Sequence, residues 1–227
     1  MPQSAQEILS HLRSLANPEN VAGMARFGIN PNQTLGISIP VLRSLARQCG
    51  TDHPLAQALW ATGVHEARIL AAFVDDPHQV SEDQMEAWVM DFDSWDVCDQ
   101  VCSNLFDHTS LAYQKAVDWS ERQEEFVKRA GFVLMAALAT HDKKAADSSF
   151  EQFFPLIILQ ADDERNFVKK AINWALRGIG KRNHSLNQKA IETARLIAQS
   201  DSRAARWVAV DALRELTSAA VQKKIAP

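Results

Sequence analysis

Cysteine is scarce in this chain, and no long apolar run is present. Three cysteines among 227 residues cannot all pair within one chain, and the start, MPQSAQEILSHL, lacks the basic region and apolar stretch of a secretory signal. We therefore expect reduced thiols and a protein of a bacterial-type cytoplasm. No apolar stretch approaches the roughly 18 residues of a membrane span, so no membrane partner is expected.

Glycine and proline are also few, with eight of each. The alternation of apolar and polar residues that marks strands is nearly absent. Apolar residues instead recur at three- and four-residue spacing, as Ile8, Leu12 and Leu15 do. Breakers such as Asn17-Pro18 and Asp76-Pro77 leave segments of about 10–16 residues. The sequence therefore predicts an all-α protein of short helices.

An overall basic excess is missing, because the net charge is −4. The charge is uneven, however. Residues 1–108 carry 5 Lys+Arg against 14 Asp+Glu, whereas residues 109–227 carry 19 against 14. A basic half can present a polyanion-binding surface, although scattered solvated helix faces would give the same composition. The overall sign weighs against tight nucleic-acid binding, since tight DNA binders usually carry a clear basic excess.

A weak repeat with a period near 40 runs through the second half. The pentapeptide FVKRA at 126–130 returns as FVKKA at 167–171, and AARWV at 204–208 opens a similar segment. EARIL at 66–70 is an earlier relative. Paired helices with this period are typical of HEAT-like repeats, which stack into a curved solenoid. We therefore predict an all-α HEAT-like helical-repeat solenoid with a concave basic face, in one domain over 1–227. An irregular helical bundle is the alternative.

The segment SWDVCDQVC, from Ser94 to Cys102, gathers acidic and sulfur side chains. A calcium loop counted from Asp91 would need Gly and Glu where Asp96 and Cys102 stand. A zinc site would need about four ligands. No CxxC or HxxxH pair completes such a ligand set with Cys98 and Cys102. We therefore expect no metal and no other cofactor.

Helix capping explains much of this acidity. Either Asp93 or Ser94 can cap a helix, and Asp96 in the first turn suits the helix dipole. Asp99 is not explained in this way, because it lies past the first turn and shares a face with Trp95, four residues earlier. On spacing alone, the simplest interpretation is that Trp95 and Asp99 lie on the same exposed helix face by coincidence. The stripe expected to pack inward consists of Val97, Val101 and Leu105.

Four motifs occur in order along the chain. The first comprises NPEN at 17–20, MARFG at 24–28 and LGI at 35–37, followed by Pro40 and Leu42-Arg43. The second is SWDVCD at 94–99, the third FVKRA at 126–130 and the fourth FVKKAINWALR at 167–177. In this order, from about residue 17 to about residue 216, they resemble the AlkD-like DNA alkylation repair family, DNA glycosylases built from HEAT-like repeats.

The resemblance implies a site of four residues. The aspartate of the family's W-D-x-x-D element falls on Asp99 and its arginine on Arg129, and its two tryptophans fall on Trp95 and Trp174. An N-terminal aromatic, usually tyrosine, falls on Phe27, which we expect to contact DNA without taking part in catalysis. Backbone phosphates would be bound along the concave face, with about half of the candidates being ordinary solvated helix termini. These candidates are Lys128, Lys169, Lys170, Arg177, Lys181, Arg182, Arg203 and Arg206.

The reaction implied by the resemblance is hydrolysis of the N-glycosidic bond of an alkylated purine, such as 3-methyladenine or 7-methylguanine, in double-stranded DNA. A cationic base leaves without protonation, so the remaining difficulty is positive charge on the sugar. Ionised Asp99 would stabilise that charge and position water. Arg129 would lower the pKa of Asp99 or hold a phosphate, and the tryptophans would offer ring faces to the cation.

Two other functions stay open at this stage. A catalytically silent HEAT-repeat DNA-binding protein would keep the fold and some site residues, and curved helical repeats also serve as protein-interaction scaffolds. The expected state is a monomer that is associated with the nucleoid when it acts. The remaining tryptophans carry no motif and are expected to be core or half-buried side chains. They are Trp60, Trp88, Trp119 and Trp207.

Overall fold

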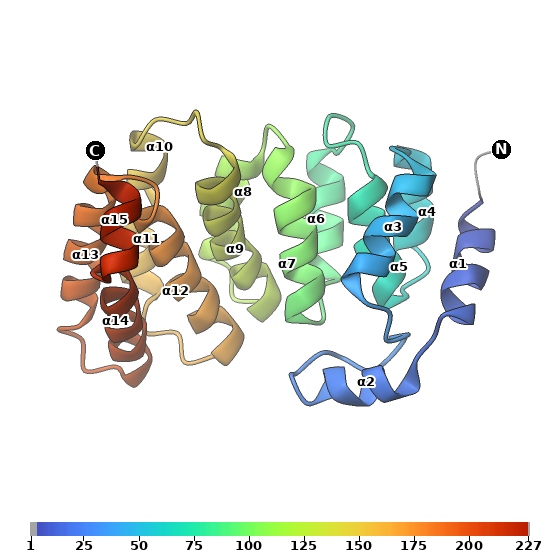
Figure 1. The fold of residues 1–227 in the computed structure, drawn as a ribbon, viewed down its shortest axis with the longest axis horizontal. Coiled ribbons are helices and arrows are strands. Elements are labelled where there is room, and N and C mark those ends of the chain that lie inside the picture. The colour runs from blue at the N-terminus through green and yellow to red at the C-terminus, as the bar shows by residue number, and fades with distance from the viewer. Residues whose placement is uncertain (1–3, 227) are drawn as a thin grey trace. The chain divides into compact units, whose positions relative to one another are not determined.

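Helices make up nearly the whole of the described chain. The computed structural model describes residues 4–226, and no strand occurs within that range. The helices run from α1 to α15, with one short 3₁₀ helix, η1 (Figure 1). None of the described helices is long and apolar enough to cross a membrane. The predicted all-α class is confirmed.

The chain forms two compact units. Unit 1 spans residues 1–109 and unit 2 spans residues 110–227. The boundary coincides with the change in charge, so that unit 1 carries the acidic excess and unit 2 the basic excess. The single domain predicted over 1–227 stays a prediction.

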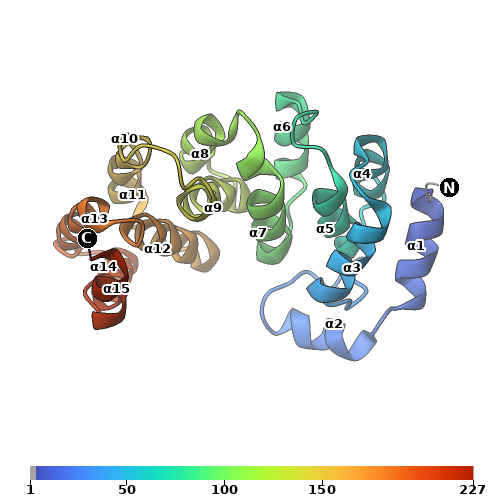
Figure 2. The same ribbon diagram turned by 45° about the horizontal axis from the view of Figure 1, so that its top comes forward.

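Unit 1 contains two layers of helices and one helix set crosswise to them. Its elements are α1 (Ala5–Ser14), α2 (Pro18–Ala25), α3 (Ile39–Cys49), α4 (His53–Trp60), α5 (His65–Val74), α6 (Glu82–Met90), α7 (Trp95–Asn104) and η1 (Phe106–His108). Helices α3, α5 and α7 follow one another in one layer, while α4 and α6 lie in the other (Figure 2). Helix α2 runs across the ends of the others (Figure 1).

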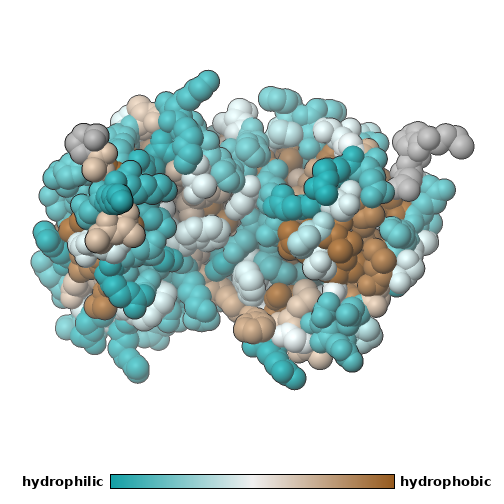
Figure 3. All heavy atoms as spheres, in the orientation of Figure 1, coloured by the Kyte–Doolittle hydropathy of each residue, from teal (hydrophilic) through white to brown (hydrophobic). Residues whose placement is uncertain are grey.

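The helix boundaries of unit 1 follow the predicted breakers. Asn17 caps α2 by accepting hydrogen bonds from two backbone N–H groups, and Pro18 occupies the first turn, where no N–H is needed. The core closes around Trp60 and Trp88, whose rings stack with centroids 4.0 Å apart. Apolar surface gathers around α3 (Figure 3), where Val41 is exposed.

Unit 2 is built from helix pairs. Its elements are α8 (Ala112–Ser120), α9 (Glu125–His141), α10 (Ser148–Glu151), α11 (Phe153–Gln160), α12 (Asn166–Gly180), α13 (His184–Ile197), α14 (Arg203–Leu216) and α15 (Ala219–Ile225). The repeated pentapeptides lie at the starts of α9, α12 and α14, the second helices of successive pairs. Equivalent positions meet in space, since the rings of Phe126 and Phe167 lie 5.7 Å apart. The repeat found in the sequence therefore corresponds to a structural repeat.

Candidate functional site

A buried glutamate holds the segment between α2 and α3 in unit 1. Glu66 is 0% exposed, and its carboxylate accepts three backbone hydrogen bonds, from Leu35 (2.8 Å), Gly36 (2.6 Å) and Ile37 (3.2 Å). A buried carboxylate is costly unless such donors compensate it. Gly36 has a φ of +78°, which favours glycine, and a Cβ there would overlap the carbonyl of Asn17. The segment is thereby fixed in one conformation.

A second buried polar side chain, that of His65, lies beside Glu66 at the start of α5 and reaches the first turn of α7. The Nε2 atom of His65 is 2.9 Å from a carboxylate oxygen of Asp96, and the hydroxyl of Ser94 donates to the other oxygen at 2.9 Å. Burial lowers the pKa of His65, but the hydrogen bond and charge of Asp96, with smaller contributions from Glu66 and Asp93, outweigh it and raise the pKa. The pair ties α5 to the first turn of α7.

Ser94 and Asp96 therefore do more than the sequence suggested. Ser94 is the residue before α7, as predicted for a cap, but its side chain makes no capping hydrogen bond to the helix. Its hydroxyl orients Asp96 instead. Asp96 lies in the first turn, where its charge suits the helix dipole.

Trp95 is the first residue of α7 and fixes the loop that follows α2. Its indole N–H donates to the backbone carbonyl of Phe27 at 3.0 Å, and Asn30 in the same loop donates to Asp93 at 2.7 Å. The Phe27 side chain is 73% exposed. An open cavity of about 540 Å³ lies against Trp95 and Phe27. Its other lining residues are Glu19, Asn20, Gly23, Met24, Ile29, Gly36, Ile37 and Ser38.

Asp99 follows Trp95 by four residues and is half-buried, like Trp95 itself. The predicted inward stripe is confirmed, because Val97, Val101 and Leu105 are fully buried. Asp99 and Trp95 consequently share the helix face that is turned away from this core. Burial raises the pKa of the Cys102 thiol, and its hydrogen bond with Cys98 and the charge of Asp99 raise it further. This thiol is therefore not an activated nucleophile.

In unit 2, Arg129 and Lys128 lie near the start of α9, and both are buried. The guanidinium of Arg129 donates to the backbone carbonyl of Phe167 at 2.5 Å, at the start of α12. The ammonium of Lys128 donates to Gln160 at 2.6 Å and lies 3.7 Å from Asp163. The two cations of the FVKRA motif thus join α9 to the next helix pair.

Trp174 lies in the middle of α12 and is half-buried. It lines a polar cavity of about 370 Å³ in unit 2. The charged residues of that lining are mostly basic, and Asp147 among them accepts a hydrogen bond from Asn183. The basic members are Lys143, Lys181, Arg182 and Lys224. Trp174 is therefore set in a positively charged part of unit 2.

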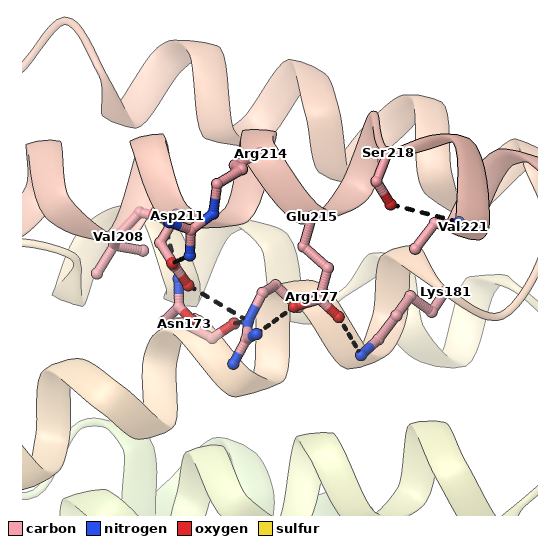
Figure 4. A network of polar contacts seen from close by, with 9 residues as sticks. All are labelled: Asn173, Arg177, Lys181, Val208, Asp211, Arg214, Glu215, Ser218 and Val221. Atoms are coloured by element: carbon pink, nitrogen blue, oxygen red, sulfur yellow. Dashed lines mark hydrogen bonds and ion pairs between the residues drawn. The ribbon is translucent and has the colours of Figure 1, made fainter.

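An ion-pair network joins α12 to α14 (Figure 4). Glu215 receives the guanidinium of Arg177 and, at 2.6 Å, the ammonium of Lys181. Asp211 lies 3.8 Å from Arg177 and also pairs with Arg214. Burial raises the pKa of Glu215, but the two hydrogen bonds and charges outweigh it and lower the pKa. Arg177 and Lys181 are thus largely neutralised within the fold.

Comparison with known proteins identifies the family. A family model described as "DNA alkylation repair enzyme" matches residues 8–216. The chain belongs to this DNA alkylation repair family. Its match includes all four motifs. No curated protein matches the chain.

A solved structure of another protein has a fold similar to that of this chain. It is described as "a new family of proteins related to the HEAT-like repeat DNA glycosylases with affinity for branched DNA structures". The TM-score is 0.75 at 19% identity, and the match covers 93% of this chain and 95% of that chain. The predicted HEAT-like helical-repeat fold is confirmed. The basic character of a concave face stays a prediction.

The remaining predicted DNA contacts of this family member differ in exposure. Arg182 donates to the carbonyls of Ala139 and Ala145 and lies over the ring of Phe150, so it also supports the fold. Lys169 is half-buried with its ammonium above Trp207. The exposed candidates are Lys170, Arg203 and Arg206. Available cations therefore gather at the starts of α12 and α14.

The sequence predicted no role for His65 or Glu66, and it did not predict the exposure of Trp207. His65 and Glu66 organise the loop that carries Phe27, but only EARIL, as a weak repeat, pointed to that region. Trp207 was expected in the core or half-buried and is instead 40% exposed. The expectation holds for the others, since Trp60, Trp88 and Trp119 are buried.

Proposed function

We propose that this member of the DNA alkylation repair family is a DNA glycosylase that excises cationic alkylated purines, such as 3-methyladenine and 7-methylguanine, from double-stranded DNA. The observation that carries the proposal is the pairing of a half-exposed carboxylate, Asp99, with Trp95 on the outer face of α7. Membership of the family turns this pairing from a coincidence of spacing into a candidate catalytic group.

The chemistry requires little more than electrostatic stabilisation. A water oxygen bonds to C1′ of the deoxyribose while the C1′–N bond breaks, and the electron pair of that bond neutralises the departing cationic base. Water releases a proton, and an abasic sugar remains. Positive charge on the sugar peaks in the transition state, where an ionised Asp99 stabilises it and orients the water. No acid is needed for the leaving base, because alkylation has already made it cationic.

The aromatic and cationic residues have supporting roles in this proposal. The rings of Trp95 and Trp174 offer electron-rich faces to the cationic base or sugar, contacts worth about 0.5–2 kcal/mol. The hydrogen bond from Trp95 to the Phe27 carbonyl holds the indole of Trp95 in one orientation. It also fixes the backbone of Phe27, whose exposed ring is assigned to a DNA contact. Arg129, which donates to the α12 carbonyl of Phe167, is assigned a supporting electrostatic role, as the family resemblance implies.

Binding to DNA is assigned to the backbone rather than to base edges. The exposed cations at the starts of α12 and α14 suit phosphate contacts that are independent of sequence. These residues are Lys170, Arg203 and Arg206, and the half-buried Lys169 lies beside them. Some predicted DNA contacts instead have hydrogen-bond partners within the protein. In this proposal they add positive electrostatic potential and hold the helices in place. They are Lys128, Arg177, Lys181 and Arg182, and each has a hydrogen bond inside unit 2.

The decisive experiment measures release of methylated bases from methylated duplex DNA by the wild type and by Asp99→Asn. We expect release by the wild type and a loss of at least about a hundredfold in the variant, the scale seen when one electrostatic contact to a transition state is removed. The matched control is Asp83→Asn, at an exposed carboxylate in the first turn of α6, which should retain full activity.

Either of two results would overturn the proposal. If the folded wild type released no methylated base, the glycosylase function would be excluded. Undiminished release by Asp99→Asn would exclude Asp99 from the mechanism. A specific observation favours one second candidate, a DNA-binding protein without catalysis: the similar solved structure is described by its affinity for branched DNA. Salt-dependent binding of duplex or branched DNA without any base release would select it.

A further inference from the structure

An open pocket of about 330 Å³ lies between the first turns of α12 and α14 in unit 2. It is lined by Lys169 of α12, Arg203, Ala204 and Trp207 of α14, and Glu164 of the preceding loop. Both helices begin at the same end of unit 2 (Figure 1). The ammonium of Lys169 lies 5.2 Å from the centre of the Trp207 ring. The pocket thus combines an aromatic plane with two cations.

Packing does not account for this tryptophan. The face of α14 that packs inward consists of small and branched residues: Ala204, Ala205, Val208, Ala209 and Ala212 are all buried. Trp207 lies off that face and is 40% exposed. Leaving this part of a large aromatic ring in water forgoes some of the stabilisation that full burial would provide. An exposed aromatic ring beside cations is instead typical of sites that stack nucleic-acid bases.

The charges around the ring suit a phosphodiester. Lys169, Arg203 and the neighbouring Arg206 form no ion pair among the residues that the structure describes. Unlike Arg177, whose charge is met by Glu215, they present positive charge to solvent. Glu164 is the one acidic residue in the pocket lining. The net charge at the pocket is therefore positive, which favours an anionic ligand.

We propose that this pocket binds an unpaired nucleotide of a DNA strand, with the base stacked on Trp207 and its phosphate held by Lys169 and Arg203. The base must be unpaired, because the faces of paired bases are covered by their neighbours within the duplex. Stacking on a ring face reads no base edge, so the site accepts any base. The site needs no glycosidic chemistry; it shares Lys169 and Arg203 with the proposed phosphate contacts but includes none of the residues assigned to catalysis. It directs the protein to single-stranded gaps, flaps and frayed ends.

The test is binding of an unmethylated, fluorescein-labelled oligothymidylate of about 20 nucleotides, longer than the site of one such module, and of a blunt duplex of the same length. Fluorescence anisotropy is measured for the wild type, Trp207→Ala and Trp207→Phe. Loss of one base–aromatic stack costs about 1–3 kcal/mol, so Trp207→Ala should bind the oligothymidylate about 5- to 150-fold more weakly. Trp207→Phe keeps a ring and should keep most of the affinity. Duplex affinity should hardly change in either variant.

The matched control is Val210→Ala, which truncates an exposed apolar residue one turn further along α14 and should bind like the wild type. Intrinsic fluorescence gives a second readout: the oligothymidylate should quench tryptophan emission of the wild type and much less that of Trp207→Phe. Equal oligothymidylate binding by folded Trp207→Ala and wild type overturns the site. So does a loss in Lys169→Ala/Arg203→Ala that Trp207→Ala does not share, since the contact would then be electrostatic alone. Base release is assayed separately, so a failed glycosylase proposal does not decide this one.

Discussion

Single buried polar side chains determine the conformation of the loop around the proposed site. Glu66 satisfies three consecutive backbone N–H groups of the loop between α2 and α3, and His65 bonds Asp96 at the start of α7. Neither residue is expected to touch substrate. Both residues affect the substrate site indirectly, because they determine the conformation of the loop that carries Phe27 and contacts Trp95.

The His65–Asp96 pair makes a pH dependence measurable at the residue scale. Because the folded protein raises the pKa of His65, protonation favours the folded state. The stabilisation is fully present below the ordinary histidine pKa of about 6.5 and is lost as pH rises through the folded pKa. The unfolding free energy of the wild type, relative to that of His65→Gln, should therefore be steady well below about pH 6.5 and fall as the pH rises above it. Urea unfolding on both sides of this pH measures it.

The Asp96→Asn variant provides the control for this prediction. Without the carboxylate, burial becomes the leading influence on His65 and lowers its pKa. Stability relative to His65→Gln should then rise with pH instead of falling. Parallel profiles for the wild type and His65→Gln would show that the pair contributes no pH-dependent stability.

At the scale of elements, the close packing of α8 against α9 in unit 2 depends on Gly131. Helices α8 and α9 approach so closely at Gly131 that an added Cβ would lie 2.5 Å from the backbone nitrogen of Ser120 and 2.9 Å from its Cα. Both atoms belong to the backbone, so no side-chain rotation can relieve the overlap. The small residue at this position therefore permits the pairing of α8 and α9 that supports Lys128 and Arg129.

Gly131→Ala should lower the unfolding free energy by about 1–3 kcal/mol or more, because overpacking displaces one helix from the other. The matched control is Gly23→Ala, in α2, where an added Cβ meets no atom within 4 Å. That change should raise stability by about 0.5–1 kcal/mol, since alanine favours helix over glycine. Urea unfolding of both variants tests the contrast. Equal stability of Gly131→Ala and the wild type would contradict the packing argument.

At the scale of the whole molecule, the division of charge is its clearest property. Unit 1 carries the acidic excess, whereas unit 2 carries the basic excess and the exposed cations at the starts of α12 and α14. DNA should therefore be bound mainly through unit 2, and unit 1 should weaken non-specific attraction. A protein of this kind should bind duplex DNA with a modest salt dependence.

Removal of three exposed cations should reduce that salt dependence. In Lys170→Ala/Arg203→Ala/Arg206→Ala, the slope of log K against log salt should become shallower by about one for each phosphate that is no longer neutralised. Fluorescence anisotropy with a blunt duplex at several salt concentrations measures the slope. The control is Arg13→Ala/Arg195→Ala, which removes exposed arginines of α1 and α13. Changes in the two variants in proportion to the charges removed, three against two, would show that only total charge matters.

The sequence predicted most of the helices and several of their boundaries. Asn17-Pro18 predicts the start of α2, because proline suits the first turn and asparagine accepts from its free N–H groups. Val97, Val101 and Leu105 predict the inward face of α7 from their spacing alone. These are local properties, fixed by helix geometry over a few residues. The four motifs likewise predicted the family.

The sequence could not show how polar side chains are used across distance. Lys181 and Arg177 resemble solvated cations in the sequence, and only folding brings Glu215, more than thirty residues away, against them. Glu66 resembles an exposed charge, and only folding wraps the α2–α3 loop around its carboxylate. Such pairings join segments far apart in sequence, so no local pattern encodes them.

The sequence by itself determined the all-α class, the repeat, the family and the identity of the candidate catalytic residues, because periodicity and short motifs are written in neighbouring residues. Tertiary structure alone decided which cations are neutralised within unit 2, that Glu66 is buried, and that Trp207 is exposed beside Lys169. The physical reason is the same in each case. Burial and pairing are properties of surfaces that meet only when distant helices pack.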